Sequence, residues 1–153
     1  MAMYAMIAGV TYQDTGFFTP LYHIASLWAA PDSMMTSMEA GMAGDMFTFT
    51  FGPAVLGAVI HMMTGAMYGA LFGVIAALTH VRGAVLVLGG LVWGAVVFAF
   101  SAWIGLPVAA AIFGSGDPIS NMASMAGWGT FLTEHLIFGV VLGLLLLGRR
   151  VSR

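Results

Sequence analysis

Three long stretches of this chain are apolar over too many consecutive residues for an ordinary soluble domain. Residues 53–78 and 84–106 contain no Asp, Glu, Lys or Arg, and residues 128–147 contain one such residue, Glu134. A helix needs about 20 apolar residues to cross the hydrocarbon layer of a bilayer. Each stretch is that long, so we predict that each one is a transmembrane helix.

The composition of the whole chain agrees with a membrane protein. Hydrophobic residues make up 61% of the sequence and charged residues 7%, whereas a soluble domain has about 25% charged residues. We expect an all-α integral membrane bundle in which residues 1–153 form a single transmembrane domain in contact with the lipid bilayer. Nucleic-acid binding is excluded, because no Lys and only four Arg are present to neutralise phosphates. The chain has no Cys, which excludes disulfides and Cys-ligated metals.

The first apolar segment, residues 1–12, is shorter than the other three. Its first ten residues span about 15 Å as a helix, half of a hydrocarbon core, before a polar run that ends in Asp14. Three arrangements are open: the span begins upstream, the short helix is carried by its neighbours, or it continues past Asp14 as one kinked span. We count it as the first of about four transmembrane helices, at residues 1–12, 53–78, 84–106 and 128–147.

Residues 17–30 begin with Phe-Phe-Thr-Pro and are apolar over a short distance. Pro20 suits the first turn of a helix, and Tyr22 and Trp28 belong to the residue types enriched at membrane interfaces. We predict a short interfacial helix here, in the first outer loop.

The two halves of the chain resemble each other. Each contains an apolar segment, a proline (Pro20 or Pro107), a short apolar stretch, an outer loop and then a His-x3-Gly-x3-Gly helix. We predict two pseudo-repeated halves related by an axis along the membrane normal. That symmetry would set His61 and His135 at the same depth in the bilayer.

Glycines recur every four residues in two of the predicted membrane helices. Residues four apart lie on one face of a helix, and in a bilayer small residues allow a second backbone to come close. We therefore predict helix packing through Gly57, Gly65, Gly69 and Gly73 in one helix and through Gly139 and Gly143 in another.

The distribution of charge predicts an orientation. The basic side chains lie in the linker after the first long span and at the C-terminus; they are Arg82, Arg149, Arg150 and Arg153. The other loops contain acidic residues, namely Asp32, Glu39, Asp45 and Asp117. Cytoplasmic loops of membrane proteins carry an excess of basic residues. We expect a multi-pass protein of the inner (plasma) membrane with a cytoplasmic C-terminus.

His61, Glu134 and His135 are the ionisable side chains that we place inside the membrane. Such groups are costly there and are functional by default. The functional alternatives are a metal site, a bis-His haem b site, and a proton or substrate relay. The structural alternative is that each imidazole bonds across the bundle to a hydroxyl group or a backbone carbonyl.

Methionine is unusually frequent, with thirteen residues. Thioethers select Cu(I), so copper handling is one interpretation of the outer residues Met34, Met38 and Met42 and of the pair Met63 and Met67. That pair, interleaved with Gly-x3-Gly, resembles the membrane motifs of the Ctr copper transporters, although here both motifs lie on one helix. The alternative is that Met fills irregular apolar surfaces.

Three segments, FFTPLYHIASLW, AVIHMMTGAMYGALFG and EHLIFGVVLGLLL, resemble small four-helix inner-membrane proteins of bacteria, the YagU-like group. The resemblance implies topology and no defined activity. Our first hypothesis is a non-enzymatic accessory or structural subunit that packs against other subunits of a larger membrane-protein complex. The second is a small transporter or a copper-handling protein, and the third is a haem b protein. No catalytic residue is predicted.

Overall fold

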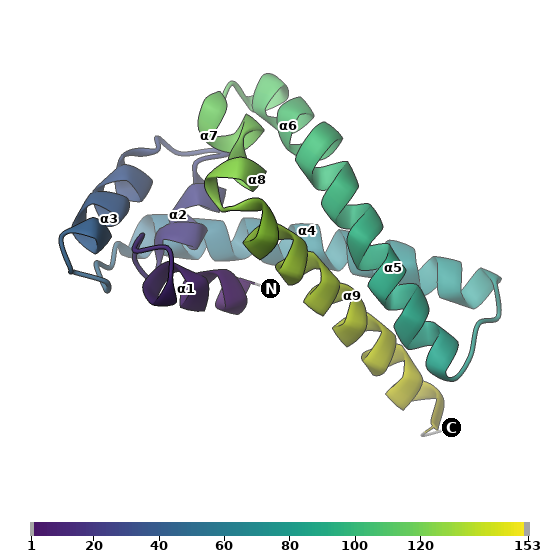
Figure 1. Cartoon of the computed structure of the whole chain (residues 1–153). Coiled ribbons are helices and arrows are strands. Elements are labelled where there is room, and N and C mark those ends of the chain that lie inside the picture. Colours follow the sequence, from purple (N-terminus) through teal and green to yellow (C-terminus); the bar gives the residue numbers. More distant parts are fainter. Residues whose placement is uncertain (1, 152–153) are drawn as a thin grey trace.

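The computed structural model of the chain describes residues 2–151, and every regular element within them is a helix (Figure 1). Two of the long rods are α4 (Phe51–Leu78) and α9 (Trp128–Val151), and a third is formed by α5 (Ala84–Phe100), the π-helical turn η1 (Ser101–Gly105) and α6 (Leu106–Phe113). The short helices gather at the end of the molecule away from the C-terminus; they are α1 (Ala2–Thr11), α2 (Thr19–Ala25), α3 (Asp32–Met42), α7 (Asp117–Ser120) and α8 (Met122–Met125).

Within residues 2–151, three helices are long and apolar enough to cross a membrane: Phe51–Leu78, Ala84–Phe113 and Trp128–Gly148. The prediction of a helical membrane protein is confirmed at this level, whereas the count of four spans and the repeat of two halves are not confirmed. The linker that contains Arg82 and the C-terminal end of α9 lie at the same end of the molecule (Figure 1).

The first apolar segment does not continue as a kinked span. Helix α1 ends at Thr11, and the backbone then turns, with the amides of Gln13 and Thr15 bonded to the carbonyls of Ala8 and Gly9. Asp14 has a positive φ of 51°, which no helical residue adopts. The helix is ten residues long and lies against α2 and α9.

The rod formed by α5, η1 and α6 extends beyond its predicted end. We expected the span to stop at Leu106, before Pro107, but the helix continues to Phe113. Proline lacks an amide hydrogen and its ring clashes with the carbonyl four residues earlier. The wider turn of η1 stands directly before Pro107, with the amide of Leu106 bonded to the carbonyl of Ser101. This local change of pitch lets the rod pass through the proline.

Helices α5 and α9 pack along most of their length through glycine on both sides. A Cβ at Gly139 would overlap the carbonyl oxygen of Gly90, and a Cβ at Gly94 would overlap the carbonyl oxygen of His135. A Cβ at Gly143 would lie 2.6 Å from the carbonyl oxygen of Leu86. The two backbones therefore touch along what we call the glycine seam: Gly90, Gly94, Gly139 and Gly143.

Helix α4 packs mainly against the short helix α2 and touches α5 and α9 far less. A Cβ at Gly57 would overlap the carbonyl oxygen of Leu21 on α2. The indole nitrogen of Trp93 donates a hydrogen bond of 3.2 Å to the carbonyl of Tyr68, which ties α5 to α4. Only 11% of the apolar window of α4 is buried within the chain, against 28% for each of the other two long helices.

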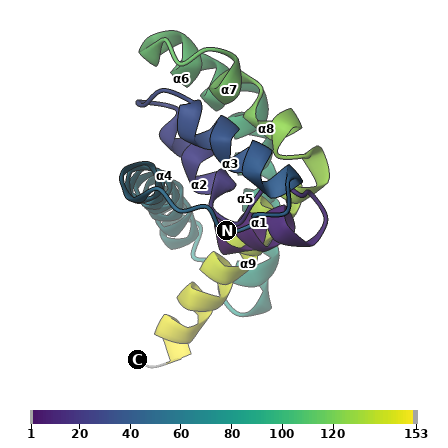
Figure 2. The ribbon, with the colours of Figure 1, turned by 90° about the vertical axis from the view of Figure 1, so that its left-hand side faces the viewer.

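The predicted interfacial helix is shorter and more buried than expected. It covers Thr19–Ala25 instead of residues 17–30, and α3 packs on it from the other side. Tyr22 is 2% exposed, and its hydroxyl oxygen accepts a hydrogen bond of 2.7 Å from the amide of Thr50. Tyr22 is therefore a core residue, whereas Trp28 is exposed. Figure 2 shows α2 between α3 and α4.

Candidate functional site

The short helices and the long ones line a partly open cavity of about 250 Å³. Every helix in residues 2–151 contributes at least one lining residue, so the cavity exists only when the whole chain is folded. Its walls are largely apolar. The polar lining residues are Gln13, Thr15, Thr19, His23, His61, Thr64, Tyr68, Ser101, Thr130, Glu134 and His135.

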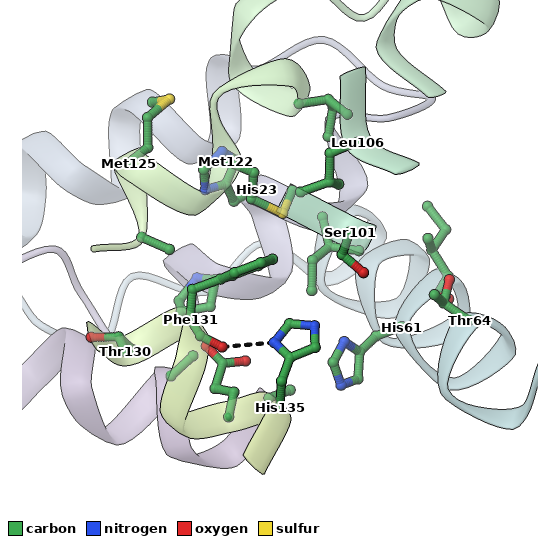
Figure 3. A pocket seen from close by; sticks show the side chains of 18 of the residues that line it. His23, His61, Thr64, Ser101, Leu106, Met122, Met125, Thr130, Phe131 and His135 are labelled. Carbon is green, nitrogen blue, oxygen red and sulfur yellow. Dashed lines mark hydrogen bonds between the residues drawn. The ribbon is translucent and has the colours of Figure 1, made fainter. Parts of the chain in front are cut away.

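His135 is positioned by its own helix and by the aromatic rings around it. Its Nδ1 lies 2.7 Å from the carbonyl oxygen of Phe131, one turn earlier on α9 (Figure 3). Because a carbonyl only accepts hydrogen bonds, Nδ1 carries the proton in the neutral ring and Nε2 is an acceptor. The rings of Phe131 and Phe98 lie 4.5 Å and 6.1 Å from the imidazole.

Glu134 lines the same cavity although it precedes His135 by one residue, or about 100° around an ideal helix. Both can line it because the cavity reaches around α9, from Ala5 on α1 to His61 on α4. Glu134 is 8% exposed and forms no hydrogen bond or salt bridge with any residue that the structure describes. A carboxyl group that has no hydrogen-bond partner among residues 2–151 therefore faces the cavity.

His61 lies on α4 and points toward His135 across the cavity (Figure 3). Both imidazoles line one cavity, whereas their equal depth in the bilayer stays a prediction. Neither ring bonds across the bundle, since His135 uses a carbonyl of its own helix and His61 has no hydrogen bond within the described part of the chain. The hydroxyl of Thr64, one turn away, donates to the carbonyl of Ile60 at 2.9 Å.

The sequence reasoning overlooked a third imidazole, His23, which α2 brings to the cavity. It is 7% exposed, and its Nε2 lies 2.6 Å from the carbonyl oxygen of Pro118. Burial lowers the pKa of His23 from its ordinary value, and the bond to Pro118 opposes part of that effect. The signal that was available is a single His within an otherwise apolar segment.

The predicted methionine and metal residues do not form one group. Among the five methionines named above, Met38 alone lines the cavity, with Met122 and Met125 of α8 as further thioethers. Met34 is buried elsewhere, whereas Met42, Met63 and Met67 are 67%, 60% and 53% exposed. Within residues 2–151, no three His, Cys, Asp or Glu side chains stand where they can hold a metal ion. Copper and haem b binding stay predictions.

The predicted packing glycines also have different surroundings. Gly139 and Gly143 lie in the glycine seam and Gly57 lies under α2, whereas a Cβ at Gly69 would meet only a side-chain carbon of Leu142 at 3.3 Å. Gly73 has no atom within 4 Å of such a Cβ, and Gly65 lines the cavity. Gly90 and Gly94, the partners across the seam, were overlooked although they have the same four-residue spacing.

Comparisons of this chain with protein-family models, with curated proteins and with solved structures found no match. The resemblance to YagU-like proteins stays a prediction. The residues of the cavity therefore carry the functional argument.

Proposed function

We propose that this chain is a small, non-enzymatic membrane transporter that holds its solute in the cavity around Glu134 and His135. One observation carries the proposal: two ionisable side chains, each more than nine-tenths buried, line a cavity between helices that are apolar enough to span a membrane. Ionisable groups in membrane helices face a cavity or a pathway because lipid cannot solvate them.

The test uses the absence of natural cysteine. Ser101 lines the cavity, whereas Val92, on the same rod, is exposed on its outer face. In proteoliposomes, a water-soluble thiol reagent should modify Ser101→Cys and leave Val92→Cys unmodified. Equal labelling of the two variants, or no labelling of Ser101→Cys, would contradict a solute pathway through the cavity.

A second candidate function is that of an accessory subunit, and the exposure of α4 favours it. The outward side chains of α4 are large and apolar, and few of its residues are covered by the rest of the chain. A partner helix would cover this face, and α1 would act as a fourth membrane helix carried by α2 and α9. Native mass spectrometry after extraction in mild detergent should then show a further protein. A chain that stays monomeric and stable would contradict this role.

We also propose that the protein lies in the plasma (inner) membrane with its C-terminus in the cytoplasm. The shared position of the linker containing Arg82 and of the C-terminal end of α9 supports this, because both basic segments then face the same side.

A further inference from the structure

We propose that the cavity binds a small uncharged alcohol with a ring-sized apolar body, a phenol being the simplest kind, and that His135 and Ser101 hold its hydroxyl group. The inference deepens the proposed transport function and rests on it, since it assigns a class of solute to the same cavity.

The polar side chains that line the cavity fall into two sets. On the side of the short helices, Nε2 of His23 donates to the carbonyl of Pro118 at 2.6 Å, and the side-chain amide of Gln13 donates to the carbonyl of Ala126 at 2.7 Å. The long rods instead carry groups that no hydrogen bond occupies within residues 2–151; these are the hydroxyls of Tyr68 and Ser101, both nitrogens of His61 and Nε2 of His135. A ligand would find its partners on this second side, between α4, η1 and α9.

The unoccupied groups include donors as well as acceptors. Nε2 of His135 is an acceptor, because the proton of that ring is on Nδ1 and bonded to Phe131. The hydroxyls of Ser101 and Tyr68 and one nitrogen of His61 can donate. An ammonium group only donates and a carboxylate only accepts, so either would leave polar groups of this set unpaired. A hydroxyl group does both, and it can donate to His135 while it accepts from Ser101, since both side chains line the cavity (Figure 3).

The fixed charges favour an uncharged ligand. Glu134 is the acidic residue among those that line the cavity, and the positive charge of the chain's amino-terminal ammonium acts on Glu134 as well as on His61 and His135. A cation would be attracted by the carboxylate and repelled by the ammonium, and an anion would meet the reverse. A charged solute thus gains little to offset the cost of leaving water.

The rest of the wall determines the body of the ligand. The ring of Phe131 lies 4.5 Å from the imidazole of His135, so an aromatic ligand held by that imidazole would pack against Phe131. Ile60, Val97 and Leu106 provide aliphatic surface. The volume of about 250 Å³ suits a compact ligand with one polar group.

The experiment is fluorine NMR titration of the full-length protein in lipid nanodiscs, with empty nanodiscs as the baseline for partition into lipid. The probes are 4-fluorophenol, fluorobenzene, which lacks the hydroxyl, and the charged compounds 4-fluorobenzylammonium and 4-fluorobenzoate. We expect saturable binding of 4-fluorophenol, at least about tenfold tighter than that of each other probe, because two hydrogen bonds separate it from fluorobenzene.

Substitutions assign the hydrogen bonds. His135→Phe keeps a ring and removes both nitrogens, so it should bring the affinities for 4-fluorophenol and fluorobenzene within about threefold of each other and leave fluorobenzene binding unchanged. Ser101→Ala should weaken 4-fluorophenol binding about fivefold. Ser124→Ala is the matched control, because this serine is exposed on α8 and does not line the cavity; it should bind every probe as the original chain does.

Several outcomes would overturn the inference. These are equal binding of fluorobenzene and 4-fluorophenol, equal or tighter binding of a charged probe, a preference for 4-fluorophenol that survives both His135→Phe and Ser101→Ala, or no saturable binding by a protein with native helical circular dichroism. If Ser101→Cys is labelled and 4-fluorophenol does not bind, the solute class is wrong and the pathway stands. If 4-fluorophenol binds and Ser101→Cys is not labelled, the binding site stands and the transport function fails.

Discussion

The glycine seam between α5 and α9 permits a quantitative prediction for Gly139→Ala. The added methyl group would overlap the carbonyl oxygen of Gly90 and lie 2.9 Å from the amide nitrogen of Gly94, whereas ordinary contacts begin at 3.4 Å. Both neighbours are backbone atoms and cannot rotate away. The carbonyl contact is the closer one, so the helices must separate by about one ångström or more, a gap that forfeits roughly half of the dispersion energy of each seam contact.

The expected loss follows from the role of these contacts in lipid. Packing between membrane helices depends on van der Waals contact, since there is no hydrophobic drive between helices that are already in lipid. We expect Gly139→Ala to lower the free energy of unfolding by about 2 kcal/mol, within the range of about 1–3 kcal/mol for overpacked sites. The assay is unfolding in mixed micelles by increasing dodecyl sulfate, followed by circular dichroism.

Gly73→Ala is the matched control, because it makes the same chemical change on a long helix where nothing lies within 4 Å. The control should be neutral or more stable by up to about 1 kcal/mol, the difference in helix propensity between Ala and Gly. Equal unfolding free energies for the two variants would refute the close approach of α5 and α9.

Three further predictions concern the short helices and the loops. Burial lowers the pKa of His23 from 6.5, so the unfolded chain binds more protons than the folded chain just below that pH, and the free energy of unfolding should fall as the pH drops through 6.5. Thermal midpoints of the original chain, measured between pH 7.5 and 5.5, should therefore decrease. The decrease should be smaller in His23→Gln. Tyr12→Phe deletes the 2.8 Å hydrogen bond to Thr130 and should lower the unfolding free energy by about 1 kcal/mol in the same micelle assay. In intact cells, an impermeant thiol reagent should label Asn121→Cys and spare Thr79→Cys; the reverse pattern would invert the proposed orientation.

The membrane helices were the most predictable part of the fold, because apolarity over the width of a bilayer is a property of sequence alone. The end of the rod formed by α5, η1 and α6 was less predictable. Pro107 is an ordinary helix terminator in sequence terms, and only the pitch change at Ser101–Gly105 shows that the helix continues to Phe113. Tyr22 was misjudged for a similar reason, because its type favours an interface whereas packing by α3 and α4 buries it.

The candidate site was predicted in part. His61, Glu134 and His135 were identified because an ionisable group in an apolar stretch is conspicuous, and all three line the cavity. His23 and Met122 were overlooked, since a residue of a short outer helix reaches this site only through tertiary packing. The exposed positions of Met63 and Met67 likewise depend on which face of α4 is covered.

By itself, the sequence determined that the chain is helical and that its long helices are apolar enough to cross a membrane. It also determined that these helices contain few charged side chains. Both properties follow from the free energy of placing side chains in lipid. Tertiary structure alone decided which glycines meet, and hence how α9 is turned. The contact of Gly94 with the backbone of His135 holds α9 in the register that directs Glu134 and its neighbour to the cavity. That choice depends on the steric fit of two backbones, which spacing along one helix does not specify.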